Sequence, residues 1–151
     1  NMQILKVRTE NRRRGDIGEE AAAEYLKSKG YRILERNYVS GGYEIDIIAE
    51  NKDYTVFAEV KSRTSTHSDK FDLPPCAAVT KEKQYKIIRA ATGYSYAHKS
   101  DKRIRFDVVE VYLANNSGKA SAERIHHIEG AFDGGAAKDY FKEKVRHRRR
   151  L

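Results

Sequence analysis

The chain has 151 residues, the length of one domain, and its 39% hydrophobic content with 10 Tyr and 5 Phe is typical of a globular protein rather than a disordered one. Its 30 Lys and Arg outweigh 22 Asp and Glu, and the net charge of +8 favours polyanionic partners, nucleic acid before anionic membrane. The apolar runs are too short for a membrane span, which excludes a transmembrane protein, and the single cysteine and absent signal pattern predict a cytoplasmic protein.

The first predicted element is a helix near the N-terminus. Residues 1–10 are polar and predict a short mobile segment. From Ile17 onward, apolar residues recur at three- and four-residue steps with charged residues between them, which indicates a helix. Asp16 lies near its expected start, where its charge suits the helix dipole, and Gly30 is placed to end it.

Three strands are predicted next. Residues 31–37 carry mixed strand signals, and the glycines at 41 and 42 indicate a turn. Residues 44–49 alternate in polarity and are rich in β-branched side chains. Residues 54–62 form the strongest strand pattern of the chain.

The second half predicts a polar loop at 64–75 and then a helix at 81–98, with Thr80 as its N-cap. Strands follow at 104–113 and 123–128. We therefore expect an α/β protein with a single domain at 11–133, preceded by the polar segment 1–10. A basic C-terminal tail at 134–151 is expected to be helical.

The middle hairpin brings acidic residues together. Glu44 and Asp46 lie two residues apart on one strand, as Glu59 and Lys61 do on the next. A two-residue turn sets Glu44 opposite Glu59, and a four-residue turn sets Asp46 there instead. Both registers place all four side chains on one face, whereas a three-residue turn would separate them, because a one-residue slip inverts a strand.

Clustered carboxylates beneath a helix favour a bound cation. Two like charges 4 Å apart repel by about 4 kcal/mol at an effective dielectric of 20. Oxygen ligands suit Mg²⁺ or Mn²⁺, which can polarise a phosphate and activate water, while Lys61 orients that water or stabilises negative charge. The alternative is a solvated polar face with cross-strand ion pairs, although Phe57 on the same face argues against full solvation.

Several short stretches between residues 12 and 133 carry a family resemblance through their order and spacing. They are Gly15-x-x-Gly18-Glu19, Gly30-Tyr31, Arg36-Asn37-Tyr38, Glu44-Ile45-Asp46-Ile47-Ile48-Ala49, Val56-Phe57-Ala58-Glu59-Val60-Lys61-Ser62-Arg63, Ala78-Val79-Thr80, Lys83-Gln84, Arg105-Phe106-Asp107-Val108-Val109, His127-Ile128 and Ala131-Phe132. In this arrangement the chain resembles the YraN-like family, bacterial proteins similar to Holliday-junction resolvases, of the PD-(D/E)XK nuclease superfamily. One departure is Tyr43, which stands where that family usually has glycine.

The resemblance implies a restriction-endonuclease-like αβββαβ core with a mixed central sheet flanked by helices. It makes Asp46 and Glu59 ligands of Mg²⁺ or Mn²⁺, with Glu19 as an accessory acidic ligand. Lys61 becomes the catalytic lysine. Residues at the start of the later helix would approach phosphates: Lys81, Lys83 and Gln84. Because a four-way junction presents two symmetric strands, the resemblance also implies a homodimer.

Other basic residues are candidates for nucleic-acid contacts. Arg63 follows the lysine strand, beside the acids. The run Arg12, Arg13 and Arg14 and the basic tail could contact phosphates, or could simply be solvated charge at the chain ends. His126 and His127 face opposite ways on a strand, so we interpret them as ordinary side chains.

Asp107 is flanked by Phe106 and Val108 on a predicted strand, and it either pairs with an arginine at the start of a helix or supports the site. The predicted function is a Mg²⁺-dependent nuclease that hydrolyses DNA phosphodiester bonds, with branched DNA as one candidate substrate. The alternatives are a nucleic-acid-binding module without hydrolysis and a scaffold protein. A pure binder gains nothing from carboxylates that repel phosphate, so the acids favour metal chemistry.

Overall fold

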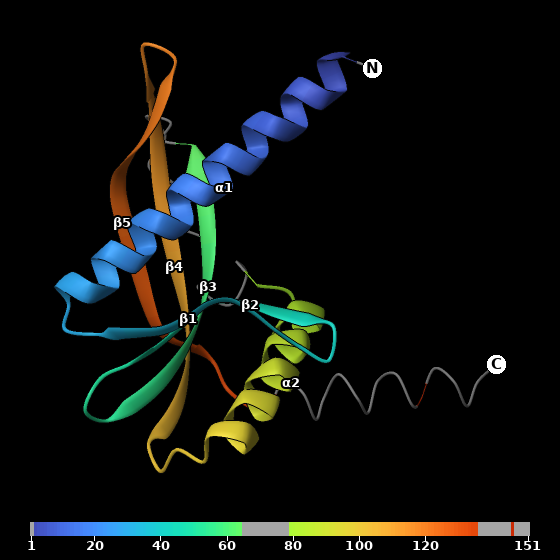
Figure 1. Ribbon diagram of the computed structural model, residues 1–151, viewed down its shortest axis with the longest axis vertical. Coiled ribbons are helices and arrows are strands. Elements are labelled where there is room, and N and C mark those ends of the chain that lie inside the picture. The colour runs from blue at the N-terminus through green and yellow to red at the C-terminus, as the bar shows by residue number, and fades with distance from the viewer. Residues whose placement is uncertain (1, 65–78, 136–145, 147–151) are drawn as a thin grey trace.

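Five strands form one mixed sheet, and one helix covers each of its faces (Figure 1). The computed structural model describes residues 2–64, 79–135 and 146. The elements are α1 (Met2–Ser28), β1 (Arg32–Ser40), β2 (Tyr43–Glu50), β3 (Tyr54–Thr64), α2 (Lys81–His98), β4 (Arg103–Asn116) and β5 (Lys119–Phe132). The predicted α/β class, with an αβββαβ core and a mixed sheet flanked by helices, is confirmed.

The strands follow the chain order β1-β2-β3-β4-β5 across the sheet. Strands β3 and β4 are parallel and joined through α2, as a crossover requires, and the other neighbours are antiparallel. Two hairpins close with two-residue turns at Gly41–Gly42 and Ser117–Gly118, whose residues all have positive φ. Such turns match the twist of the strands they join.

The sheet separates two apolar clusters. The cluster under α1 contains Ala22, Leu26, Ile47 and Val109, and the cluster under α2 contains Ile48, Phe57, Ile87, Ala91 and Tyr94. Burial on both faces explains why the central strands are rich in Ile and Val. The two helices therefore lie on opposite faces of the sheet, with α1 over β3, β4 and β5 and α2 mainly over β1 and β2.

The first helix is longer than predicted. It begins at Met2 rather than Ile17, so the expected mobile segment is helical and Asp16 lies inside the helix. The residues before Gly15 are almost all exposed, so no apolar periodicity marked them, although most are good helix formers. Gly30, with φ 88°, ends the helix as expected, and the N–H of Tyr31 bonds to the carbonyl of Leu26.

The last strand is also longer than predicted, because its register with β4 continues to both ends of the hairpin. The predicted loop at 64–75 and basic tail at 134–151 lie almost wholly outside the described residues. Neither α1 nor α2 carries an apolar run that could cross a membrane.

Candidate active site

Strand β2 separates from β3 at Asp46. The ladder between these strands runs from Glu50↔Thr55 to Ile47↔Ala58. This register corresponds to the four-residue turn, the second of the two arrangements considered above. Where the next backbone bond would form, the Asp46 carboxylate accepts the N–H of Val60 at 2.8 Å.

The side chains of β2 change faces around Asp46. Ile45 belongs to the cluster under α2, whereas Ile47 belongs to the cluster under α1, although both hold odd positions. On the neighbouring strand, Asn37 has φ 50° and interrupts the β1–β2 pairing beside Asp46. The prediction that four charged side chains share one regular strand face is therefore wrong, because the strand is distorted at that point.

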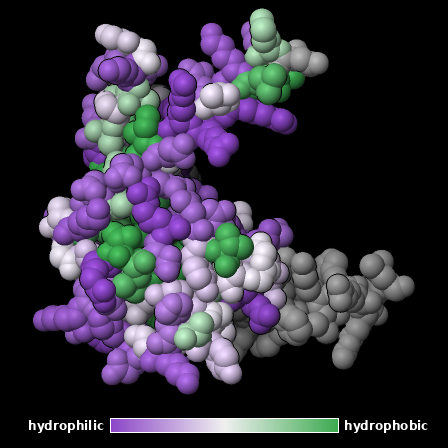
Figure 2. Space-filling view, in the orientation of Figure 1, coloured by the Kyte–Doolittle hydropathy of each residue, from purple (hydrophilic) through white to green (hydrophobic). Residues whose placement is uncertain are grey.

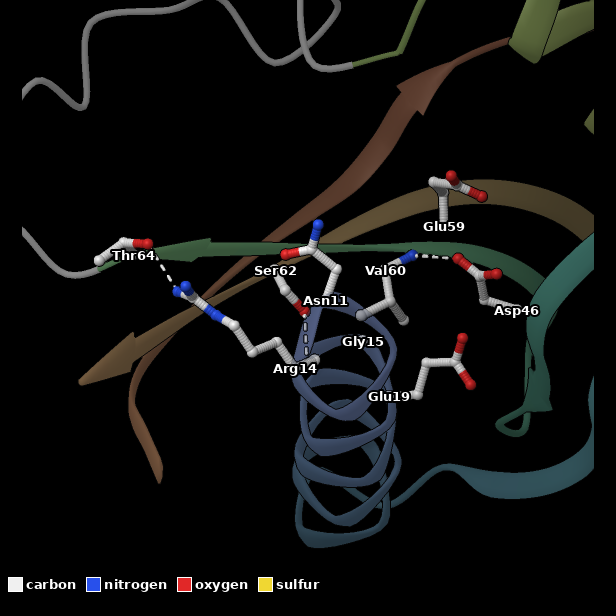
Figure 3. Close-up of a pocket in the computed structure, with 9 residues that line it drawn as sticks. All are labelled: Asn11, Arg14, Gly15, Glu19, Asp46, Glu59, Val60, Ser62 and Thr64. Atoms are coloured by element: carbon white, nitrogen blue, oxygen red, sulfur yellow. Dashed lines mark hydrogen bonds between the residues drawn. The ribbon is translucent and has the colours of Figure 1, made fainter. Parts of the chain in front are cut away.

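Three carboxylates surround this distortion (Figure 3). Glu59 lies on one side of β3, Glu19 of α1 lies on the other, and Asp46 lies between them beside Val60. They line an open pocket of about 440 Å³ that also includes Arg14. The gap between β2 and β3 thus gives acids from both faces of the sheet access to one space.

Glu59 is the buried member of this group, with 5% of its surface exposed. Lys61 and Lys83 lie 3.4 and 3.7 Å from its Oε1 atom. Its Oε2 atom is the one buried side-chain polar atom in the described residues without a hydrogen-bond partner. Burial, and then the charge of Asp46, raise the pKa of Glu59 to about 7, although both lysines oppose the shift.

Glu19 reaches the pocket because α1 packs closely against β3. Gly18 is buried, and a Cβ atom built there would lie within 3.2 Å of the Ser62 Cβ atom. A side chain at position 18 would therefore require the Ser62 hydroxyl to move and the contact between α1 and β3 to widen by a few tenths of an ångström. Burial, and then the charge of Asp46, raise the pKa of Glu19.

Asn37 is a site residue that the sequence analysis missed. With its amide nitrogen turned inward, it donates to Oε2 of Glu19 and Oε1 of Glu44, each at 3.1 Å. Asparagine tolerates positive φ better than most residues, which was the available signal. Glu44 itself is exposed and lies two residues before Asp46 on β2.

The residues at this pocket fit a divalent cation held by few protein ligands. Carboxylate oxygens suit Mg²⁺ or Mn²⁺, and the unpartnered Oε2 of Glu59 offers a free lone pair. No three Asp, Glu, His or Cys side chains within residues 2–64 and 79–135 come close enough to form a complete metal cage. One or two carboxylates, completed by waters and substrate phosphate, are the usual arrangement for Mg²⁺.

The family model described as uncharacterised protein family UPF0102 matches residues 18–111. The chain belongs to the UPF0102 family. A UPF0102 protein of Clostridium acetobutylicum is 47% identical over 124 residues, which cover 81% of this chain and 95% of the relative. Similar proteins of Clostridioides difficile (45% over 123 residues, 81% and 98%) and Caldanaerobacter subterraneus (44% over 119 residues, 78% and 93%) extend the comparison. These matches confirm the YraN-like membership, and the family match spans Glu19, Asp46, Glu59 and Lys61.

Within this UPF0102 chain, the start of α2 lies near Glu59, because Lys83 is 3.7 Å from the Oε1 atom of that carboxylate. Thr80 caps the helix as predicted, accepting the N–H of Lys83, which orients the first turn toward Glu59. Lys81 is exposed at the first helical position. Gln84 is buried, and its amide nitrogen donates to the carbonyl of Val79, a placement that does not favour the expected phosphate contact.

The predicted arginines lie in three different places. Arg63 donates to the Glu110 carboxylate on β4 at 2.8 Å, so it is already engaged by an acid. Arg14 lines the acidic pocket and donates to the Thr64 hydroxyl at 2.6 Å. Arg12 and Arg13 are exposed on the projecting half of α1.

Two further features lie away from the carboxylates. Tyr43 is partly buried against the cluster under α2, and its ring meets that of Tyr85 edge to face. Asp107 is fully buried and accepts hydrogen bonds from Arg105, His127 and the Gly130 N–H. Asp107 thus pairs with an arginine of its own strand, Arg105, and not with an arginine at a helix start as expected.

Proposed function

We propose that this UPF0102 chain is a metal-dependent nuclease of the PD-(D/E)XK type that hydrolyses phosphodiester bonds of DNA. The observation that carries the proposal is the meeting of Asp46, Glu59 and Lys61 where β2 leaves β3, with a buried carboxylate oxygen left unpartnered. The net charge of +8 supports a nucleic acid as the substrate.

Each residue has a distinct role in this proposal. Asp46 and Glu59 would hold Mg²⁺ or Mn²⁺, and Glu19 supplies further negative charge from α1. When bound, the metal polarises the phosphate and makes water a better nucleophile. Lys61 orients the attacking water and stabilises the charge that develops on the phosphate. Lys83, which also contacts Glu59, helps to hold that carboxylate in place.

A second candidate function is nucleic-acid binding without hydrolysis. The exposed Arg12 and Arg13 on α1 favour it, because phosphate contacts need only accessible cations. The three carboxylates oppose it, since they repel phosphate unless a cation neutralises them. The homodimer implied by the resemblance remains a prediction, which sedimentation velocity of the purified chain would test.

The decisive experiment is cleavage of labelled linear, flapped and four-way-junction DNA, with Mg²⁺ or Mn²⁺ and with chelator. Asp46→Asn and Lys61→Met are compared with Asp53→Asn and Lys52→Met, the same changes at exposed positions of the β2–β3 turn. We expect metal-dependent cutting that falls at least about 100-fold in the two site variants only.

Two results would overturn the proposal. Wild-type protein that binds DNA in a salt-sensitive way but cuts none of the substrates with either metal would establish the binding function instead. Unchanged cleavage by Asp46→Asn would move the chemistry to other residues.

A further inference from the structure

A second pocket adjoins the acidic one. Its walls are the N-terminal half of α1 and the tip of the β4–β5 hairpin. Both pockets share Asn11, Arg14 and Thr64, so they adjoin at the hydrogen bond between Arg14 and Thr64. In Figure 2 the two projections that form these walls stand apart, with open space between them.

The charge of the second pocket differs from that of the first. Its lining includes Arg13 and Arg14 on one wall and Lys119 on the other, against one acid, Glu10. Ile17 and alanines of the hairpin add apolar surface to the same lining. Basic and apolar side chains together suit a chain of phosphates whose sugars and bases contact carbon atoms.

We propose that this basic groove, between the N-terminal half of α1 and the β4–β5 hairpin tip, binds the backbone of one nucleic-acid strand flanking the cleaved bond. The proposal rests on the proposed nuclease function for the position of the cut. A peptide partner is disfavoured, because the groove adjoins the acidic pocket at Arg14 and a peptide would have no need of the carboxylates there.

The strands give the length of the groove. Five residues separate Glu59 from Thr64 on β3, and Thr64 pairs with Leu113, three residues before Asn116, the partner of Lys119. At about 3.3 Å per residue, these eight residues span about 26 Å. A B-form strand rises about 3.4 Å per nucleotide, so a flank of about eight nucleotides reaches Lys119.

The test begins with binding of a labelled 24-base-pair duplex in chelator, measured by fluorescence anisotropy at several salt concentrations. Arg13→Glu and Lys119→Glu alter exposed side chains, and Lys52→Glu at the opposite end of β3 is the matched control. We expect each groove variant to weaken binding about fivefold to tenfold and to lower the salt slope by about one. The control should bind like wild type.

The second step uses Mg²⁺ and substrates shortened to four nucleotides on either side of the mapped cut. Lys119→Glu should cut as well as wild type when one particular flank of the substrate is shortened. It should still cut less well than wild type when the other flank is shortened. Groove variants that bind the long duplex like wild type would overturn the proposal. If wild type never cuts, the nuclease proposal fails, while the binding measurements still decide whether the groove holds nucleic acid.

Discussion

The carboxylate of Asp46 takes the hydrogen bond from the Val60 N–H that a neighbouring strand would otherwise accept. This contact joins fold and site, because the residue that ends the β2–β3 ladder is also the acid between Glu19 and Glu59. Structural and chemical roles of Asp46 can be separated by two substitutions.

Asp46→Asn should keep an acceptor for the Val60 N–H and lose only the charge, whereas Asp46→Ala should lose both. We expect the alanine variant to be less stable than the asparagine variant by about 1 kcal/mol, the cost of one partly buried unsatisfied N–H. Urea denaturation measures the difference. Equal stabilities would show that water replaces the carboxylate at no cost.

Glu59→Gln should stabilise the metal-free protein at pH 8 by about 1–2 kcal/mol, because it removes a buried charge close to Asp46. The folded pKa of about 7 lies above the ordinary value of 4.5, so the folded protein holds this proton more tightly than the unfolded chain. Wild-type stability should therefore fall between pH 4.5 and 7 through this group.

Denaturation of both proteins across this pH range, with and without Mn²⁺, checks the prediction. Mn²⁺ should raise the melting temperature of wild type at pH 8 and leave that of Glu59→Gln unchanged. A variant that is less stable than wild type in chelator at pH 8 would contradict the expected sign.

Gly18→Ala should destabilise the protein by about 1–3 kcal/mol, since the new methyl group would meet the Ser62 side chain. Combining it with Ser62→Gly should recover much of the loss, because the double variant moves the side-chain volume across the contact. Thermal denaturation and cleavage rate should recover together if the contact positions Glu19. Recovery of stability without recovery of the cleavage rate would show that the contact stabilises the fold but does not position Glu19.

Asp107→Asn should cost about 3 kcal/mol or more, because it leaves Arg105 and His127 without their buried carboxylate. Burial raises the pKa of Asp107, but hydrogen bonds from His127, Arg105 and the Gly130 N–H outweigh it, so the pKa lies below its ordinary value of 3.8. Its stabilising contribution is therefore complete above pH 3.8 and is lost as pH falls through the lower folded value.

Acid titration followed by circular dichroism tests this contribution, with Asp53→Asn as the exposed control. Between pH 4 and 2, Asp107→Asn should lose less stability than wild type or the control. Parallel curves for all three proteins would show that other carboxylates govern acid unfolding.

Local sequence patterns were sufficient for the order of elements, but not for the face of the sheet on which each acid of the hairpin lies. Alternation along residues 54–62 predicted that Glu59 and Lys61 lie on the same side of β3, and Thr80 indicated the start of α2. The sequence left two possible partners for Glu59 across the hairpin, Glu44 or Asp46, because only a turn with an even number of residues was expected to place the acids on one face.

Contacts between distant segments were not predictable in the same way. The approach of Gly18 to Ser62 joins positions 44 residues apart, and neither residue has a titratable group to attract notice. The distortion at Asp46 lies beside the positive φ of Asn37, which is on another strand. The outer half of α1 lacks a buried face, so periodicity had nothing to detect.

One uninterrupted helix carries both Arg13 of the basic groove and Glu19 of the acidic pocket. Their six-residue separation corresponds to about 9 Å along the axis, and it cannot change unless the helix unwinds. The helix therefore fixes the spacing between the basic groove and the acidic pocket, and each inserted or deleted residue would change it. One inserted residue between them would rotate the arginines about 100° around the axis, whereas four would leave them only about 40° from their present direction and about 6 Å farther out.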